Sequence, residues 1–489
     1  MNHPVKQQPK LSFWQIWNVS FGFLGVQIGF ALQNGNVSRI LTDLGADLSS
    51  LSLFWLAAPV MGLIVQPIVG ALSDRTWVGL GRRLPFILVG ASVAATCMML
   101  LPNASMVVAF IPPMIFGLFI FAIKDAAFNV SFQPFRALVS DMVPPEQRNL
   151  GYSVQTVLIN IGAVVGSILP FVLTNVVGLE NAAKAGHVAP SVIWAFYIGA
   201  TILFGSVLWT VFRTKEYAPE DYYAYKGMDA AAVAEQAATP KTPVERLTGF
   251  FELMREAPQI MRQLALVQFF SWFSLFIMWT YFPAAIAQSA WGIGVEWFDP
   301  SYIKSMGGLP DEIAAARGAA GDWVGILYAG YSLFAALFAV ALTKIANTFG
   351  RKLTYSLSLL AGGLGYLSFV FFQDPTVTEV NLWFTQVEVT HGAVGLMLPM
   401  VGIGIAWAAI LAMPYAILAG ALPADKTGVY MGIFNFTIAA PQIVSGLVSG
   451  WILSNIFDNH AVYIVMLAGA SMVLGALSVI FVKEEQTVA

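Results

Sequence analysis

The feature that most constrains this chain is a series of apolar runs of about 20 residues, the length that an α-helix needs to cross a bilayer. Backbone polar groups cannot stay unpaired in lipid, so each run can cross only as a helix. Composition agrees, because 58% of the 489 residues are hydrophobic and only 10% are charged. We therefore predict an all-α polytopic membrane protein. Its twelve transmembrane helices begin near Phe13, Leu51, Pro85, Val107, Gly151, Val192, Leu264, Trp323, Thr354, Val394, Gly428 and Ala461.

An internal repeat divides these helices into two sets of six. GALSDRTWVGLGRR at residues 70–83 corresponds to AVALTKIANTFGRK at 339–352, and QPFRALVSD at 133–141 corresponds to MPYAILAGA at 413–421. Two copies of one unit predict two pseudo-symmetric bundles around a central cavity, with a binding site near the midplane. We expect the first bundle at residues 1–212, a cytoplasmic linker with an interfacial helix at 213–262, and the second bundle at 263–489.

The distribution of basic residues predicts the orientation. If the spans alternate, most Lys and Arg residues fall on the side of both termini, and the clear exceptions are Arg39, Lys184, Lys304 and Arg317. By the positive-inside rule, both termini are then cytoplasmic, in a multi-pass protein of the cell (inner) membrane. The loop from Gly292 to Asp322 is then external. We expect its acidic residues to be solvated and to carry no chemistry.

One apolar stretch, Phe121 to Met142, carries ionisable groups where a membrane helix normally has none. On a 3.6-residue repeat Asn129, Phe132 and Arg136 fall within about 40° of Asp125, so one face carries an acid, an amide, a ring and a guanidinium. An acid inside the hydrocarbon region is costly and usually functional. We interpret Asp125 as a protonation site and Arg136 as a cation nearer the cytoplasmic mouth.

The alternative is that Asp125 is a structural acid, held by the neighbouring Lys124 or by a group on another helix.

Several helices also carry amides and aromatic rings suited to a hydroxyl-rich ligand. Such a ligand needs groups that donate and accept hydrogen bonds, and flat rings against which a pyranose can lie. Interhelical hydrogen bonding is the alternative role for each amide, and lipid contact or helix packing for each ring. The candidate substrate-binding residues are Gln27, Gln33, Asn129, Gln155, Trp272, Trp279, Asn435 and Gln442.

Several motifs in one order resemble a known family. They include PVMGLIVQPIVGALSDR at 59–75, its continuation to GRR at 81–83, DAAFNVSFQPFRA at 125–137 and FNFTIAAPQIVSGLVSG at 434–450. Together they resemble the sucrose transporter family of the major facilitator superfamily, the sucrose/α-glucoside:proton symporters. Residues 42–50 lack the histidine of the plant members, and Trp279 and Tyr281 stand where plant members carry two acids. These departures resemble the bacterial branch.

The resemblance implies a major facilitator fold and import of sucrose, maltose or a related α-glucoside by proton symport with alternating access. It implies proton coupling at Asp125 and Arg136. The superfamily loop motif implies a gating role for Asp74, Arg75, Arg82 and Arg83.

Three other functions stay open on this reasoning: a sodium-coupled glycoside symporter, a proton-coupled efflux antiporter, and a non-transporting sugar sensor. The sequence has no GxxxxGK[ST] loop of an ATP-driven pump, and its single cysteine, Cys97, belongs to no Cys/His cluster. We expect no enzyme activity, no cofactor and no metal. The expected partners are a small sugar, a proton and the lipid bilayer, with no nucleic acid, and the expected state is a monomer.

Overall fold

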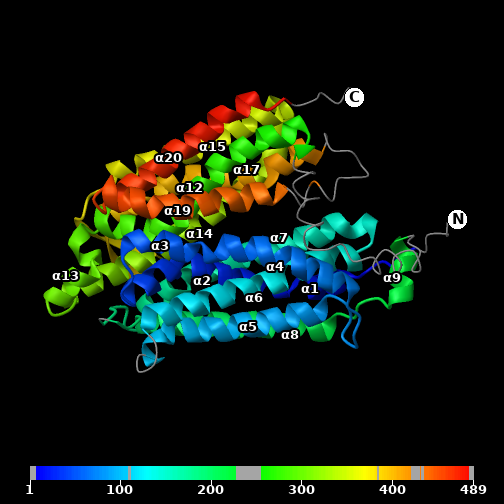
Figure 1. Ribbon diagram of the computed structural model, residues 1–489, viewed down its shortest axis with the longest axis horizontal. Coiled ribbons are helices and arrows are strands. Elements are labelled where there is room, and N and C mark those ends of the chain that lie inside the picture. The colour runs from blue at the N-terminus through cyan, green and yellow to red at the C-terminus, as the bar shows by residue number, and fades with distance from the viewer. Residues whose placement is uncertain are drawn as a thin grey trace.

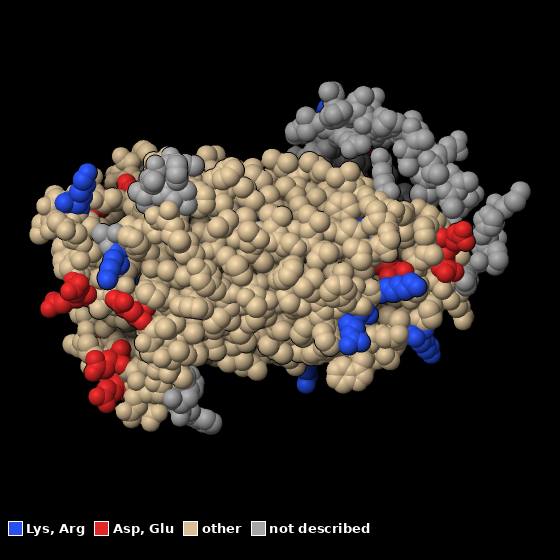
Figure 2. Space-filling view, turned by 90° about the horizontal axis from the view of Figure 1, so that it is seen from below, with Lys and Arg blue, Asp and Glu red and all other residues tan. Residues whose placement is uncertain are grey.

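A computed structural model describes residues 7–107, 112–184, 186–226, 255–382, 385–419, 430 and 434–483. Within these residues, 12 helical segments are long and apolar enough to cross a membrane. Figure 1 shows them running along the long axis of the molecule, with both chain ends and α9 at one end and α13 at the other. We call these ends the terminal face and the opposite face. Figure 2 shows a wide band with few charged groups between the two faces, as expected for a surface that contacts lipid.

The first half of the chain forms six of these segments. Helix α2 packs on α7 and α8, α5 packs on α6 and α8, and α4 packs on α6. The helices of this half are α1 (Phe13–Ser20), α2 (Gly22–Asp43), α3 (Leu48–Trp55), α4 (Ala57–Arg75), α5 (Leu84–Leu100), α6 (Pro113–Met142), α7 (Arg148–Asn175) and α8 (Pro190–Arg213). Helix α9 (Pro219–Lys226) follows on the terminal face.

The second half forms the other six segments, which confirms the six-plus-six architecture. Helix α12 packs on α19 and α20, α15 packs on α17 and α20, and α14 packs on α17. The helices are α12 (Gln259–Ser289), α13 (Pro300–Ser305), α14 (Asp311–Phe349), α15 (Arg351–Leu367), α16 (His391–Gly395), α17 (Met397–Ala419), α19 (Phe436–Asn455) and α20 (Ala461–Ser478). Short 3₁₀ turns are η1 (Leu101–Val107), η2 (Pro145–Gln147), η3 (Val295–Phe298), η4 (Ser368–Phe371) and η5 (Val479–Phe481).

Small residues on α2 let the helices of the first half approach closely. A Cβ added at Gly22 would meet Phe135, one at Gly25 would meet the backbone of α8, and one at Gly29 would meet Phe128. Three glycines at spacings of three and four residues share one helix face, so α2 lies directly against both α6 and α8. This packing fixes the position of the candidate residues on α2 relative to α6.

The eighth span begins earlier than the sequence analysis predicted. Helix α14 starts at Asp311, not near Trp323, so part of the expected external loop is helical. Apolar content alone misses this start, because the first turn carries two acids, Asp311 and Glu312, which the helix N-terminus stabilises. The predicted starts at Val107 and Gly428 fall at or next to segments 108–111 and 420–429, which lie outside the described residues. The expected interfacial helix at 244–254 also lies outside them.

The opposite face carries a β-hairpin that the sequence analysis did not assign. Strands β1 (Val377–Leu382) and β2 (Thr385–Thr390) pair antiparallel, with Val377 opposite Thr390 and Leu382 opposite Thr385. Val387 and Val389 of β2 are buried, whereas Glu388 between them is exposed. This period of two was visible in TQVEVT and is the signal of a half-buried strand.

Candidate functional site

Helix α6 carries Asp125 into the interior of the first half, where only 2% of the residue is exposed. Gln33 on α2 donates a hydrogen bond from Nε2 to Asp125 Oδ1 at 2.9 Å. The second carboxylate oxygen of Asp125 has no hydrogen-bond partner among the described residues. The carboxyl group is therefore buried, held in place by an amide, and able to form one more hydrogen bond.

A second amide pair lies one turn further along α6. Asn129 Nδ2 donates to the backbone oxygen of Asp125 at 2.8 Å, and Gln66 Nε2 on α4 donates to Asn129 Oδ1 at 2.6 Å. Polar groups of α2, α4 and α6 thus form one connected layer. Gln66 was not among the residues predicted from the sequence, although an amide within the apolar run at 59–72 was the available signal.

Lys124 is fully buried beside Asp125 and forms no salt bridge with it among the described residues. Its Nζ has no hydrogen-bond partner there and lies 4.7 Å from the ring centroid of Phe121 and 5.8 Å from that of Phe128. Lys124 therefore contacts aromatic faces, and Gln33 holds the carboxylate of Asp125.

Arg136 lies further along α6 toward the terminal face and is exposed. Its guanidinium carbon lies 4.4 Å from the ring centroid of Phe132 and forms no ion pair with a described residue. The expected face of α6 therefore holds Asp125, Asn129, Phe132 and Arg136 in order. Asp125 and Arg136 form no direct bridge, because eleven residues of helix place them about 16 Å apart along the axis.

Three indole rings form a cluster in the second half. Trp272 and Trp279 of α12 lie with centroids 6.3 Å apart, and Trp407 of α17 lies 6.0 Å from the first and 6.1 Å from the second. Trp272 Nε1 is buried without a hydrogen-bond partner among the described residues. The sequence predicted the two α12 rings and missed Trp407, because only the tertiary structure brings α17 beside them.

The tryptophan cluster and the Asp125 layer lie at the same depth. Ser38 Oγ on α2 donates to the backbone oxygen of Thr280 on α12 at 2.8 Å, which aligns the two helices. Both helices run from the terminal face to the opposite face. Gln33 lies about 7.5 Å before Ser38 along α2, whereas Trp272 and Trp279 lie about 12 Å and about 1.5 Å before Thr280 along α12. Asp125, which accepts from Gln33, is therefore level with the rings.

The remaining sequence candidates form no described contact with either group. Gln27 packs against Gly162 of α7, and Gln155 on α7 is buried with Oε1 unpartnered among the described residues. Gln442 donates to Ile438 in its own helix at 3.1 Å. Asn435 is exposed at the start of α19.

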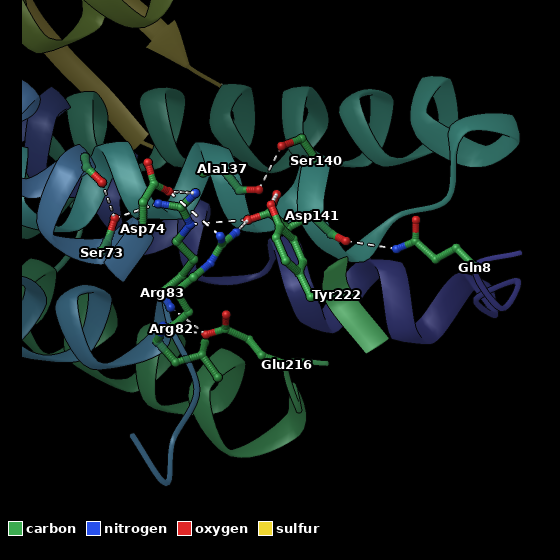
Figure 3. Close-up of polar contacts among 12 residues, drawn as sticks. Gln8, Ser73, Asp74, Arg82, Arg83, Ala137, Ser140, Asp141, Glu216 and Tyr222 are labelled. Atoms are coloured by element: carbon green, nitrogen blue, oxygen red, sulfur yellow. Dashed lines mark hydrogen bonds and ion pairs between the residues drawn. The ribbon is translucent and has the colours of Figure 1, made fainter. Parts of the chain in front are cut away.

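The predicted gating residues meet at the terminal face of the first half (Figure 3). Arg83 Nη2 lies 2.6 Å from Asp74 Oδ1, and Arg83 Nη1 donates to Ser73 Oγ at 2.6 Å. Arg82 forms an ion pair with Asp141 at the end of α6, and Arg83 Nε lies 3.3 Å from the same carboxylate. These contacts join the ends of α4, α5 and α6. The side chain of Arg75 lies outside the described part of the chain.

The segment after α8 docks on this cluster. The ring of Tyr222 in α9 lies 4.0 Å from the guanidinium carbon of Arg82, and its hydroxyl donates to Asp141 Oδ1 at 3.3 Å. Burial alone would lower the pKa of the Arg82 guanidinium, but the charges and hydrogen bonds of Asp141, Tyr222 and Asp74 outweigh it and raise the pKa. Arg82 is therefore held firmly in its charged form.

Glu216 fixes the turn that presents both arginines. Its Oε1 accepts hydrogen bonds from the backbone N–H groups of Arg83 at 2.7 Å and Leu84 at 2.8 Å. Gly81 before them has φ of 113°, and an added Cβ would meet Glu216, so glycine is required there. Burial raises the pKa of the Glu216 carboxyl, and the backbone hydrogen bonds partly oppose that rise.

We expect Glu216→Ala to destabilise the first half by about 1–3 kcal/mol, because two backbone donors lose their acceptor. Thermal unfolding in detergent should show a lower midpoint. Glu220→Ala is the matched control, because Glu220 is an exposed acid in the first turn of α9. An equal midpoint for the two variants would contradict the assigned role of Glu216.

Four charged residues lie between the two halves at the opposite face. Arg39 Nη1 of α2 lies 3.6 Å from Asp322 Oδ1 of α14, and Arg317 Nη2 of α14 lies 3.4 Å from Asp43 Oδ1 of α2. Arg39 is 7% exposed and Asp322 is 3% exposed. The expectation that the acids up to Asp322 are solvated is therefore wrong for Asp322, because the helical start of α14 turns it toward α2. We call Arg39, Asp43, Arg317 and Asp322 the interhalf latch.

Comparison with known proteins identifies the family. A family model described as MFS/sugar transport protein matches residues 40–291, more than half of the chain. The chain belongs to this family. It is a multi-pass membrane transporter of sugars, not an enzyme, and the sucrose transporter resemblance is confirmed.

The relatives of this MFS sugar transporter include sucrose and glucoside carriers. It is 24% identical to the sucrose transport protein SUC4 of Arabidopsis thaliana over 481 residues, covering 92% of this chain and 86% of the relative. It is 25% identical to the general alpha-glucoside permease of Schizosaccharomyces pombe over 288 residues, covering 56% of this chain and 48% of the relative.

Solved structures share the fold of this MFS sugar transporter. A crystal structure of a variant of the nucleoside transporter NupG aligns with a TM-score of 0.62 and 16% identity, covering 96% of this chain and 99% of that one. A variant of the peptide transporter POT in complex with alafosfalin aligns with a TM-score of 0.61 and 15% identity, covering 98% of each chain. These similarities establish the twelve-helix major facilitator fold.

Proposed function

We propose that this transporter imports an α-glucoside disaccharide, such as sucrose or maltose, by proton symport with alternating access. The observation that carries the proposal is the buried Asp125 carboxyl, hydrogen-bonded to Gln33 at the depth of the tryptophan cluster. Removal from water favours the protonated form of a carboxyl group, and access to water favours its release. The sugar site opens to one side of the membrane and then to the other. A carboxyl group at the same depth therefore binds a proton in one state and releases it in the other.

The substrate class is supported by the chemistry at this depth and by the relatives. An indole surface at Trp272, Trp279 and Trp407 suits a pyranose ring, and the amides of Gln33, Gln66 and Asn129 suit hydroxyl groups. Gln27, Gln155, Asn435 and Gln442 remain proposed sugar ligands. Matching relatives are named for sucrose transport and for alpha-glucosides.

The proposed topology places the terminal face in the cytoplasm of a cell (inner) membrane. The basic residues in the loop between α4 and α5 support it, because cytoplasmic loops are enriched in Lys and Arg. We assign residues 1–212 and 263–489 to the two bundles and 213–262 to the cytoplasmic linker. We also propose that the transporter is a monomer.

A cysteine at exposed Glu220, in a Cys97→Ser background, should react with an impermeant thiol reagent from the cytoplasmic side only.

In this proposal the two charged clusters control access at opposite ends of the molecule. The interhalf latch closes the opposite face in the conformation described here, and Asp74, Arg82 and Arg83 with Arg75 gate the terminal face. Arg136, exposed on the terminal side of Asp125, supplies the cation that favours proton release toward the cytoplasm.

The decisive experiment is uptake of a labelled α-glucoside panel into proteoliposomes. We expect accumulation of sucrose or maltose when a proton gradient is imposed and none without it. Accumulation driven by a sodium gradient alone would overturn proton symport. Export of the sugar in exchange for protons would overturn import.

We expect Trp279→Ala to weaken sugar binding by about 1–3 kcal/mol, roughly 5- to 150-fold in Kd, because a stacked ring is lost. Asn435→Ala should weaken it by a similar amount, because a hydrogen bond from its exposed amide to the sugar is lost. Equilibrium binding of labelled maltose to purified protein measures both. Trp451→Ala is the control, since that ring is 62% exposed on the outer surface of α19. Unchanged affinity in the Trp279 variant, with the protein folded, would assign the ring to packing.

A further inference from the structure

A cavity separate from the Asp125 layer lies between the two halves at the opposite face. Its volume is about 300 Å³, at the lower end of the range for small-molecule sites. Asp322 lines it, and its partner Arg39 lies about 9 Å along α2 from Gln33. The polar and aromatic groups on its wall include Glu180, Asn181, Trp291, Asp322, Trp323 and Glu388.

Asp322 has acceptor capacity beyond its ion pair with Arg39. Neither carboxylate oxygen makes a hydrogen bond of normal geometry among the described residues, although Arg39, Thr174 and Asn181 lie around it. A carboxylate that is 3% exposed and lacks hydrogen-bond donors of normal geometry favours a ligand that donates hydrogen bonds. With Glu180 and Glu388, the wall carries three acids, and like charge disfavours an anion. Among the described residues no group of acids, His and Cys has the arrangement of a metal site.

Two indoles line the same cavity as these acceptors. Trp323 Nε1 donates to the backbone oxygen of Ala393 at 2.7 Å, so one ring is fixed in position. Trp291 is half-buried at the same cavity. Carboxylates and amides beside fixed rings are the pairing that recognises a pyranose, whose edge donates hydroxyl protons and whose face is apolar.

The β-hairpin forms one wall of the cavity and links the halves. Val387, Glu388 and Val389 of β2 line it from the second half. Thr385 Oγ1 donates to the backbone oxygen of Asn175, at the end of α7 in the first half, at 3.1 Å. The cavity therefore has walls from both halves, and Asp322 of the interhalf latch is one of its lining residues.

We propose that this cavity, the hairpin cavity, binds one hexopyranose unit of the substrate on the side from which it enters, before transfer to the site at Asp125. This inference rests on the proposed function, because it takes the imported sugar as its ligand. Asp322, Glu180 and Asn181 accept or donate to its hydroxyl groups, and Trp291 and Trp323 contact its ring.

Protection of an engineered thiol tests the proposal. Ala315 lines the cavity and is exposed, so Ala315→Cys in a Cys97→Ser background should react with an impermeant maleimide added at the opposite face. At maltose concentrations of about ten times its Kd, mass action predicts a roughly tenfold slower reaction. Ala319→Cys, at a second lining position, should behave in the same way. Equal rates with and without maltose at both positions would overturn the proposal.

Three controls identify the source of the protection. Ser305→Cys, exposed on α13 outside the cavity, should react at one rate with or without maltose. Adding Trp291→Ala should remove the protection, and adding Trp279→Ala should leave it, because Trp279 belongs to the cluster near Asp125. Loss of protection with Trp279→Ala would mean that the effect comes from that deeper site, which would overturn the proposal.

Uptake measured on the same proteoliposomes separates this proposal from the proposed function. Protection without proton-driven accumulation would refute symport and support the hairpin cavity. Accumulation without protection would refute the hairpin cavity and support symport.

Discussion

Asp125→Asn should abolish sugar accumulation driven by a proton gradient, so that the internal concentration rises only to the external one. Asparagine keeps the size of the side chain, and its oxygen can still accept the hydrogen bond that Gln33 donates at 2.9 Å. It cannot bind and release a proton, so the variant should still bind maltose and exchange it across the membrane. Proteoliposome uptake with an imposed pH gradient, compared with exchange at equal pH, measures both activities.

The matched control is Asp311→Asn, the same change at an exposed acid in the first turn of α14. It should leave accumulation unchanged. An Asp125→Asn protein that still concentrated maltose in response to a pH gradient would exclude Asp125 as the coupling group. Lys124, fully buried and without a described hydrogen bond, would then be the next candidate.

Arg39→Met should destabilise the closed opposite face by about 3–5 kcal/mol, because it leaves Asp322 buried without its nearest cation. The same change removes two hydrogen bonds to Asn181, each of 2.8 Å. Thr280 lies fully buried beneath the latch, in a second, small cavity. A cysteine at Thr280, in a Cys97→Ser background, should react with an impermeant reagent more than about tenfold faster in the Arg39→Met protein, since every 1.4 kcal/mol is tenfold in population.

Charge complementarity provides the stringent control for the latch. Arg39→Met combined with Asp322→Leu removes both charges, so most of the cost should disappear. Lys304→Met, at an exposed basic residue of α13, should change nothing. If the reaction at position 280 is as slow in folded Arg39→Met protein as in the parent, the latch does not hold the opposite face closed.

Part of the candidate site was predictable because it lies on one helix. Asp125, Asn129, Phe132 and Arg136 share a face of α6, as the 3.6-residue period requires, and Trp272 and Trp279 share a face of α12 for the same reason. Gln33 was a candidate by residue type, and its hydrogen bond to Asp125 joins residues 92 positions apart. No local period specifies such a pair, so Gln66 and Trp407 were missed.

The sequence by itself determined the twelve apolar spans, their grouping into two sets of six, and the family, because these follow from hydrophobic length, internal repetition and ordered motifs. Tertiary structure alone decided which charges meet. Asp322 appears in sequence as one more acid of a polar loop. It is buried because α14 starts at Asp311 and packs against α7 and α2, and because Arg39 offsets its charge. Pairing of buried polar groups depends on distances of a few ångströms between helices far apart in the chain, and only the packed structure sets those distances.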